Sequence, residues 1–147
     1  MSVNSTLPSL DFSKMSLEQK KGLLPLLQAK ARFIERNRLR YYVPYDKQQA
    51  FHADGVDKRE RAFLAANQVG KTIAGGAETA MHLTGRYPDW WQGRRFDKPI
   101  RCMAGSESAE LTRKGVQRIL LGPPEDRNAW GTGFIPGDCI VSHSMRQ

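Results

Sequence analysis

The amino-acid sequence predicts an α/β fold: a parallel sheet with flanking helices, preceded by an N-terminal helix. Two short apolar runs, residues 61–66 and 100–104, are typical of buried strands, and a segment with helical periodicity follows each of them. Strands that alternate with helices in this way indicate a parallel sheet with right-handed crossovers. With 147 residues, the chain is long enough for a single domain that buries its own core.

The first expected element is an N-terminal helix. Residues 1–14 are polar and without periodicity, and we expect an extended lead-in there. Ser16 and Gln19 have the spacing of a capping box, and apolar residues then recur at steps of three and four to about Arg40. We expect Pro25 to break or kink this amphipathic helix. Its C-terminal half carries basic side chains that would either bind the phosphate backbone of a nucleic acid or form the hydrated outer face of the helix: Lys30, Arg32, Arg36, Arg38 and Arg40.

Two more helices follow the apolar runs. Residues 71–83 have a helical periodicity that places Glu78 on the exposed side, and Gly85 is a stop signal. Ser106 or Ser108 is expected to cap the next helix, which runs through residue 121 and ends at a Gly-Pro-Pro sequence. Residues 125–147 are rich in glycine and predict a loop with at most one further strand.

Composition and charge narrow the classes of function. Lysine and arginine number 23 against 15 aspartate and glutamate, and the net charge of +8 favours polyanionic partners, nucleic acid first. Cys102 and Cys139 lack the spacing of a zinc site or a disulfide framework, which fits a reducing, cytoplasmic setting. No apolar stretch approaches the roughly 20 residues that span a bilayer, and no export signal is recognisable, so we expect no membrane partner.

Residues 65–72, AANQVGKT, match the Walker A pattern of a phosphate-binding loop, with alanine in place of the usual first glycine. The match begins at the end of an expected strand and opens an expected helix, where backbone N–H groups and the helix dipole surround a phosphate. Glycine permits close approach of the backbone, the lysine reaches the β- and γ-phosphates, and the threonine hydroxyl would hold Mg²⁺. The expected nucleotide-binding residues are Ala66, Asn67, Gln68, Val69, Gly70, Lys71 and Thr72.

Gln48 lies some two dozen residues before the phosphate loop. A side-chain amide can both donate to and accept from the edge of adenine, so Gln48 is a candidate base reader, although glutamine is also common on helix surfaces. Trp90 and Trp91 interleave with arginines in a composition able to stack on bases, but aromatic residues that cover the edge of the core are the favoured interpretation. Scattered histidines without ligand spacing fit structural roles: His52, His82 and His143.

Together these segments resemble the N-terminal ATPase region of the large subunits of tailed-phage terminases, which are DNA-packaging motors with a helicase-like P-loop NTPase fold. The resemblance covers about residues 42–138: PYDKQQAFH is similar to the family's adenine motif, FLAANQVGKT to its Walker A motif, and WGTGFIPGD to the segment before Walker B. It implies ATP and Mg²⁺ as ligands, with Gln48 at the base and Thr72 at the metal ion. It also implies double-stranded DNA, a terminase small subunit and a portal as partners, with homo-oligomers in the full-length protein only, in the cytoplasm of a bacterial host.

Two departures from the family pattern change what is expected. Many members carry an arginine inside the phosphate loop, whereas residues 66–69 contain none, so a charge-stabilising arginine must come from elsewhere; Arg101, Arg113 and Arg118 are equal candidates. No apolar run that ends in Asp-Glu precedes Gln147, so the acids that hold Mg²⁺ and activate water are missing. The family's nuclease domain is missing as well.

These departures predict an incomplete fold from a truncated gene, a prophage remnant or a split coding sequence. Its parts are an N-terminal extension over residues 1–41 and a partial ATPase domain over residues 42–147. The expected function is ATP–Mg binding that powers viral DNA packaging, with little hydrolysis by the isolated chain, whose status as an enzyme stays open. The alternative is a non-catalytic, basic nucleic-acid-binding protein. A small-molecule kinase is a third possibility, for which no residues specify an acceptor pocket.

Overall fold

The computed structural model describes residues 11–144, so most of the predicted lead-in lies outside the described part of the chain. Two compact units are present, divided between Phe33 and Ile34. The first holds a short 3-10 helix, η1 (Phe12–Lys14), and nearly all of α1 (Leu17–Glu35). The predicted capping box is confirmed: the backbone N–H of Ser16 donates to Oε1 of Gln19 at 2.9 Å, and the N–H of Gln19 donates to Oγ of Ser16 at 3.2 Å.

Helix α1 differs from its prediction in two ways. Pro25 lies inside the helix, which continues through the residue expected to break it, and the helix ends at Glu35 instead of near Arg40. None of its residues is buried, so its apolar side chains are exposed or only half-buried. None of the helices among residues 11–144 combines the length and the apolar character needed to cross a membrane.

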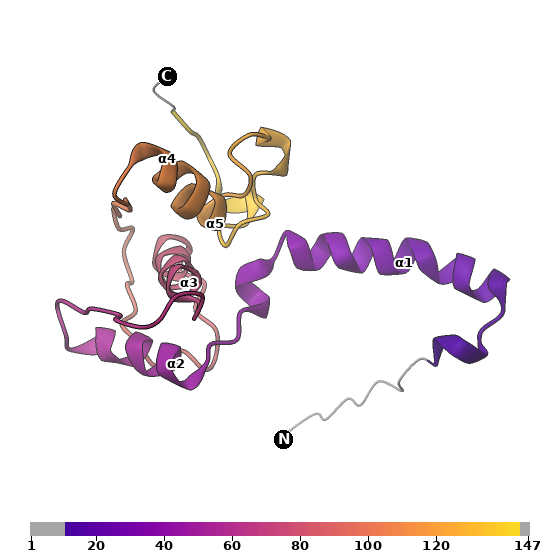
Figure 1. Ribbon diagram of the computed structural model, residues 1–147, viewed down its shortest axis with the longest axis horizontal. Helices are drawn as coiled ribbons and strands as arrows, with labels where there is room; N and C mark the ends of the chain where they lie inside the picture. Colours follow the sequence, from indigo (N-terminus) through magenta and orange to yellow (C-terminus); the bar gives the residue numbers. More distant parts are fainter. Residues whose placement is uncertain (1–10, 145–147) are drawn as a thin grey trace. The chain divides into compact units, whose positions relative to one another are not determined.

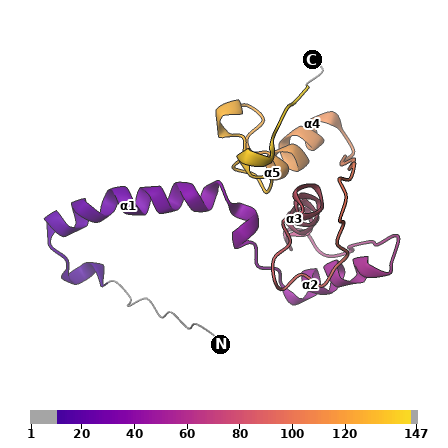
Figure 2. The ribbon, with the colours of Figure 1, turned by 180° about the vertical axis from the view of Figure 1, so that it is seen from behind.

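The second unit is built from short helices around one longer helix, α3 (Lys71–Thr84). Figures 1 and 2 show α3 between α2 (Asp46–Ala53) on one side and the α4–α5 segment on the other. The α4–α5 segment consists of α4 (Ala109–Leu111), the π-helix η4 (Thr112–Gln117) and α5 (Arg118–Leu120). The 3-10 helices are η2 (Arg38–Tyr41), η3 (Asp54–Val56), η5 (Arg127–Ala129) and η6 (Gly137–Cys139).

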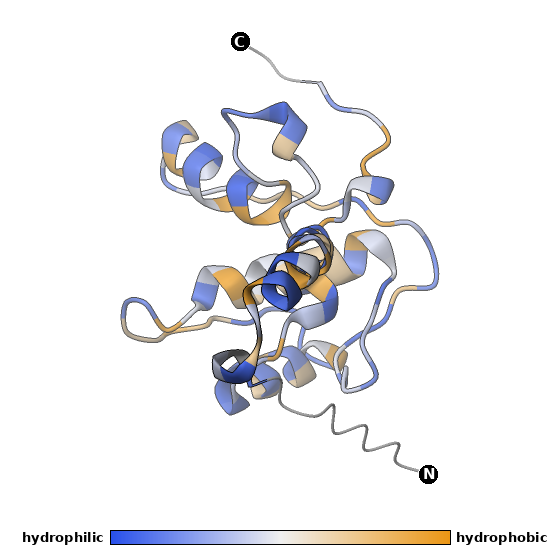
Figure 3. Cartoon of the chain, turned by 90° about the vertical axis from the view of Figure 1, so that its right-hand side faces the viewer, coloured by the Kyte–Doolittle hydropathy of each residue, from blue (hydrophilic) through white to orange (hydrophobic). Residues whose placement is uncertain are grey.

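The predicted α/β fold with a parallel sheet is wrong, because residues 11–144 contain helices, turns and coil but no strand. The two predicted strands, residues 61–66 and 100–104, run as coil. A strand exists only through hydrogen bonds to a neighbour, and a short apolar run does not specify that neighbour. Their apolar side chains accordingly stay outside the core: Leu64 is 91% exposed and Met103 is 98% exposed. Figure 3 shows hydrophobic stretches along coil segments as well as on helices.

Helix α3 is the centre of the core, as its small residues allow. Ala74, Ala77, Ala80 and Met81 are completely buried, which brings neighbouring segments close to the helix backbone. The helix ends as predicted: Gly85 adopts the left-handed conformation with φ of 68°, and its N–H donates to the carbonyl of Met81 at 2.9 Å. Four residues from other segments complete the core cluster: Leu39, Tyr42, Trp91 and Phe134.

The α4–α5 segment is also close to its prediction, although its middle is wound as a π-helix. Ser108 is the N-cap, and its Oγ accepts a hydrogen bond from the N–H of Leu111 at 3.1 Å. The segment ends before Gly122, which has φ of 119°. The chain then folds back along it, because the N–H of Phe134 donates to the carbonyl of Ile119 at 2.8 Å. Beyond this return, residues 140–144 form no strand.

Candidate nucleotide-binding site

The turn that precedes α3 carries the Walker A pattern. Residues 67–70 form the turn, and Gln68 and Gly70 have positive φ angles of 62° and 76°. A side chain at Gly70 would be strained by this φ and would also place its Cβ 2.7 Å from Nε2 of Gln48. The predicted junction between phosphate loop and helix is therefore present at Gly70, although no strand leads into it.

Lys71, the first residue of α3, reaches back over the turn. Its ammonium donates to the carbonyl oxygens of Ala65 at 2.6 Å and Ala66 at 2.8 Å. Thr72 is exposed in the first turn of the helix, and the loop residues 66–69 are exposed as well. The turn thus presents one cation and the free N–H groups of a helix start to solvent, an arrangement suited to an anion.

Gln48 in α2 is buried, with 3% of its surface exposed, and it contacts the same turn. Nε2 donates to the carbonyls of Gly70 at 3.2 Å and Val69 at 3.4 Å. Oε1 accepts from the backbone N–H of Tyr45 at 3.0 Å and from the hydroxyl of Tyr42 at 3.4 Å. All four hydrogen-bonding positions of the amide are therefore in use. The structure brings together the predicted base reader and the phosphate loop.

A cavity of about 450 Å³ opens beside this contact. Gln48, Gln68 and Gly70 line it together with Arg38 and Tyr45. Tyr45 is 74% exposed, so its ring is available to a flat ligand. The guanidinium of Arg38 lies 5.2 Å from the centre of the Phe134 ring. The cavity has the size of a nucleobase with its sugar and joins the phosphate-loop turn directly.

Glu78 lies beneath this site, and the prediction that it is exposed is wrong, because only 6% of its surface is accessible. Its carboxylate accepts from Nδ1 of His52 at 2.7 Å, forms an ion pair with Arg61 and lies 3.4 Å from Nε2 of His82. Burial acts to raise the pKa of Glu78, but hydrogen bonds from His52, His82 and Arg61 outweigh it and hold the pKa below the ordinary value. Glu78 is therefore an ionised, buried centre that ties α2 and residue 61 to α3.

Tyr42 connects this centre to Gln48. Its hydroxyl lies 3.1 Å from Nε2 of His52, and its ring packs edge-on against Phe134. Burial, and secondarily the charge of Glu78, raise the pKa of Tyr42 to about 12, so the phenol keeps its proton at neutral pH. Sequence reasoning missed Tyr42 and Glu78. The spacing of Ala74, Ala77, Glu78 and Met81, at steps of three and four, was the signal that places Glu78 on the buried stripe.

None of the three candidate arginines lines this cavity. Arg118 pairs with Glu125 at 3.1 Å, and Arg101 and Arg113 are exposed. The arginine that does line the cavity is Arg38, which the sequence placed among the basic residues of the N-terminal helix.

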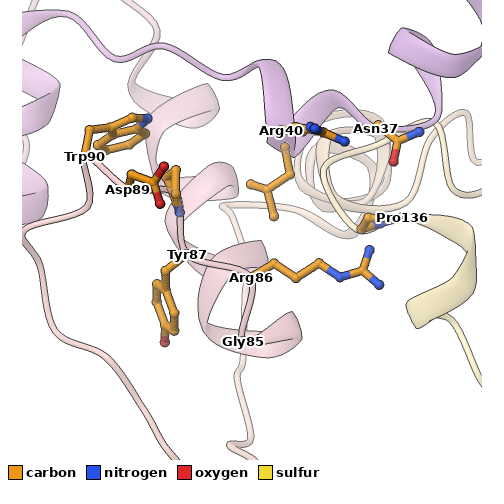
Figure 4. A pocket seen from close by; sticks show the side chains of 10 residues that line it. Asn37, Arg40, Gly85, Arg86, Tyr87, Asp89, Trp90 and Pro136 are labelled. Carbon is orange, nitrogen blue, oxygen red and sulfur yellow. The ribbon is translucent and has the colours of Figure 1, made fainter. Parts of the chain in front are cut away.

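A second cavity, of about 660 Å³, lies near η2 and the loop after α3. Figure 4 shows Arg40 of η2 and two residues of the loop after α3, Arg86 and Trp90, among the residues that line it. Arg86 is engaged with Asp138, whose two carboxylate oxygens accept at 3.2 and 2.5 Å. Asp89 also lines this cavity, so its positive and negative charges are nearly balanced.

The structure confirms the structural interpretation of Trp91. Its ring is 5% exposed and belongs to the core. Arg94 lies over Phe96 at 5.7 Å, and Arg95 over Tyr87 at 5.2 Å. His52 and His82 are likewise held by structural contacts, because their ring nitrogens lie 2.7 and 3.4 Å from the carboxylate of Glu78.

Comparisons with known proteins cover most of the chain. A family model described as "Terminase large subunit, T4likevirus-type, N-terminal" matches residues 62–146. The chain is also 39% identical, over 140 residues, to the terminase large subunit of Salmonella phage P22; this alignment covers 87% of the chain and 28% of the P22 protein. No solved structure matches the chain.

Proposed function

The chain belongs to the terminase large-subunit family, and from that premise we propose that it binds ATP with Mg²⁺ at the turn before α3 to power the packaging of viral DNA. The chain spans 28% of the length of the P22 relative, so the activity of a whole terminase is part of this proposal. Double-stranded DNA, a terminase small subunit and a portal are the partners that we propose on the same grounds, in the cytoplasm of a bacterial host.

One observation carries the nucleotide part of the proposal. The side chain of Gln48 donates to the carbonyl of Gly70, which lies 22 residues further along the chain, at 3.2 Å. Two motifs that are unrelated as local sequence therefore meet in one place, beside a cavity of about 450 Å³. An adenine reader and a phosphate loop must be adjacent if one nucleotide is to contact both, and this contact supports that adjacency. Because protein groups occupy the whole amide, Gln48 would exchange one of these hydrogen bonds for one to the base.

Different residues would contact the phosphates, the magnesium ion and the base. The ammonium of Lys71 would exchange the carbonyls of Ala65 and Ala66 for phosphate oxygens, which are stronger acceptors because they are charged. The first N–H groups of α3 and its dipole add to the attraction. A magnesium ion would neutralise the phosphates, and the exposed hydroxyl of Thr72 is its expected protein ligand. The base would enter the cavity beside Gln48, within reach of the ring of Tyr45.

The Lys71→Ala variant tests this proposal. We expect the 147-residue chain to bind a fluorescent ATP analogue in the presence of Mg²⁺, and the variant to bind it more than about tenfold more weakly, because a charge-assisted contact to phosphate is lost. Lys114→Ala is the matched control, since Lys114 is an exposed lysine of the α4–α5 segment, where it pairs with Glu110. Equal affinities of the chain and the Lys71→Ala variant, with both proteins folded by circular dichroism, would refute the proposed site.

A second function, a non-catalytic nucleic-acid-binding protein, remains the alternative to the motor. The net charge of +8 supports it, and the exposed guanidinium of Arg40 beside the second cavity offers a contact for a phosphate backbone. Binding of duplex DNA that weakens with salt, persists in Lys71→Ala and ignores ATP would favour this alternative.

A further inference from the structure

Two tyrosine–histidine arms converge on the carboxylate of Glu78. In the first arm, Nδ1 of His52 lies 2.7 Å from Oε2 of Glu78, and Nε2 of the same ring lies 3.1 Å from the hydroxyl of Tyr42. In the second arm, Nε2 of His82 lies 3.4 Å from Oε1 of Glu78, and Nδ1 lies 3.0 Å from the hydroxyl of Tyr87. The arms have the same chemistry. Of the two, the first continues to the candidate site, through Tyr42 and Gln48.

The charge of Glu78 fixes the direction of the first hydrogen bond in this arm. An ionised carboxylate can only accept, so Nδ1 of His52 is the donor. The hydroxyl of Tyr42 lies between Nε2 of His52 at 3.1 Å and Oε1 of Gln48 at 3.4 Å, so it joins the imidazole to the amide.

The arm ends on the oxygen of the Gln48 amide, which has a single workable orientation. With Oε1 directed to Tyr42 and Tyr45, the NH₂ group faces the carbonyls of Val69 and Gly70. In a flipped amide, the NH₂ group would face the N–H of Tyr45, and the oxygen would face the two carbonyl oxygens of Val69 and Gly70. These hydrogen bonds would then be lost, because donors would face donors and acceptors would face acceptors. The end of the amide that meets the phosphate loop is therefore a donor.

We propose that Glu78, His52 and Tyr42 are positioning residues that fix the orientation of the Gln48 amide at the nucleotide site. This inference rests on the proposed function, because it assigns these residues a part in shaping the turn that would hold the phosphates. His52 and Glu78 are 1% and 6% exposed and act through Tyr42 without a contact to the nucleotide. Their effect reaches the nucleotide through the hydrogen bonds of the Gln48 amide to the carbonyls of Val69 and Gly70, so it falls on the triphosphate part of ATP.

The two arms provide a matched pair of variants, Tyr42→Phe and Tyr87→Phe. Each removes one phenolic hydroxyl that contacts a histidine of the Glu78 cluster, and each keeps the ring. Binding of ATP and of inorganic triphosphate to the 147-residue chain is measured by calorimetry. We expect Tyr42→Phe to weaken the binding of ATP and of triphosphate alike by about fivefold, the effect of one lost hydrogen bond. Tyr87→Phe should leave the affinities for both ligands unchanged.

Unchanged affinities for ATP and triphosphate in Tyr42→Phe would overturn the inference. So would an effect of Tyr87→Phe on ATP as large as that of Tyr42→Phe.

A nucleotide-free measurement separates this inference from the proposed function. The side-chain NH₂ signals of Gln48 in a ¹⁵N-labelled chain should shift and exchange faster with water in Tyr42→Phe, and should stay in place in Tyr87→Phe. Unchanged Gln48 signals in Tyr42→Phe would overturn the inference even if ATP binds. A chain that binds neither ATP nor triphosphate would instead refute the proposed function and, with it, the role of these residues at the nucleotide site.

Discussion

Replacing Glu78 with alanine is expected to lower the free energy of unfolding of the second unit by about 3 to 5 kcal/mol. The carboxylate is the shared partner of Arg61, whose side chain is 20% exposed, and of His52, whose side chain is 1% exposed. Without it, the guanidinium of Arg61 loses its countercharge and the buried N–H of His52 loses its acceptor, and both losses are costly in a protein interior. Urea unfolding followed by tryptophan fluorescence measures the difference, because Trp90 and Trp91 pack against His52.

Glu110→Ala is the matched control for this variant. Glu110 also pairs with a basic residue, Lys114, but its side chain is 72% exposed, so its removal is expected to change stability by at most about 0.5 kcal/mol. A Glu78→Ala protein that is as stable as the Glu110→Ala protein would show that the cluster beneath the site contributes nothing to folding.

Acid should unfold the second unit for the same reason. The pKa of Glu78 is lower in the folded chain than its ordinary value of 4.5, so the unfolded chain binds the proton more readily. The stabilisation that the ionised carboxylate provides is therefore complete above a pH equal to the ordinary pKa of 4.5. It is lost progressively as the pH falls below that value toward the lower pKa of the folded chain. Glu78→Gln, which has no carboxylate, should show a flatter loss of stability between about pH 5 and pH 3. Equal acid sensitivity of the two proteins would contradict the role assigned to this carboxylate.

Two adjacent glycines in α3 should respond in opposite directions to alanine. A Cβ at Gly76 would collide with Cγ2 of Ile119, a β-branched side chain with little freedom to turn aside, whereas a Cβ at Gly75 would meet nothing within 4 Å. We expect Gly76→Ala to cost about 1 to 3 kcal/mol by overpacking and Gly75→Ala to add about 0.5 to 1 kcal/mol, the usual gain in helix propensity.

Each variant is the control for the other, because both change the same helix by one methyl group. Thermal unfolding of the two proteins in parallel gives the comparison. Stabilisation of both by similar amounts would mean that α5 does not pack against α3 at Gly76 as the structure has it.

Local patterns in the sequence predicted the elements that are defined locally. The capping box at Ser16, the start of α3 at Lys71 and its stop at Gly85 all depend on residues within one helical turn, and all three are present. The sheet was predicted wrongly, because strand pairing is a long-range property to which residues 61–66 and 100–104 contribute only an apolar composition. The structure adds the proximity of Gln48 to Gly70, which the sequence alone could not fix.

The buried position of Glu78 was missed for a different reason. The helical periodicity of residues 71–83 places Glu78 on the exposed side, as is usual for a charged side chain. The buried stripe of α3 instead includes Glu78 beside Ala77 and Met81, because Arg61 and His52 come from other segments to pair with its carboxylate. Partners that are distant in sequence reverse the ordinary preference of a carboxylate for water.

The contact of Lys71 with the carbonyls of Ala65 and Ala66 makes any binding of an anion at this turn a ligand-exchange reaction. The incoming group must displace two neutral acceptors that are tethered to the same chain and so are present at a high effective concentration. A monovalent anion such as chloride offers a single point of charge and competes poorly with that bidentate partner. A polyphosphate offers several charged oxygens at once, so under the proposed function the turn would favour highly charged, multidentate anions before any base is bound.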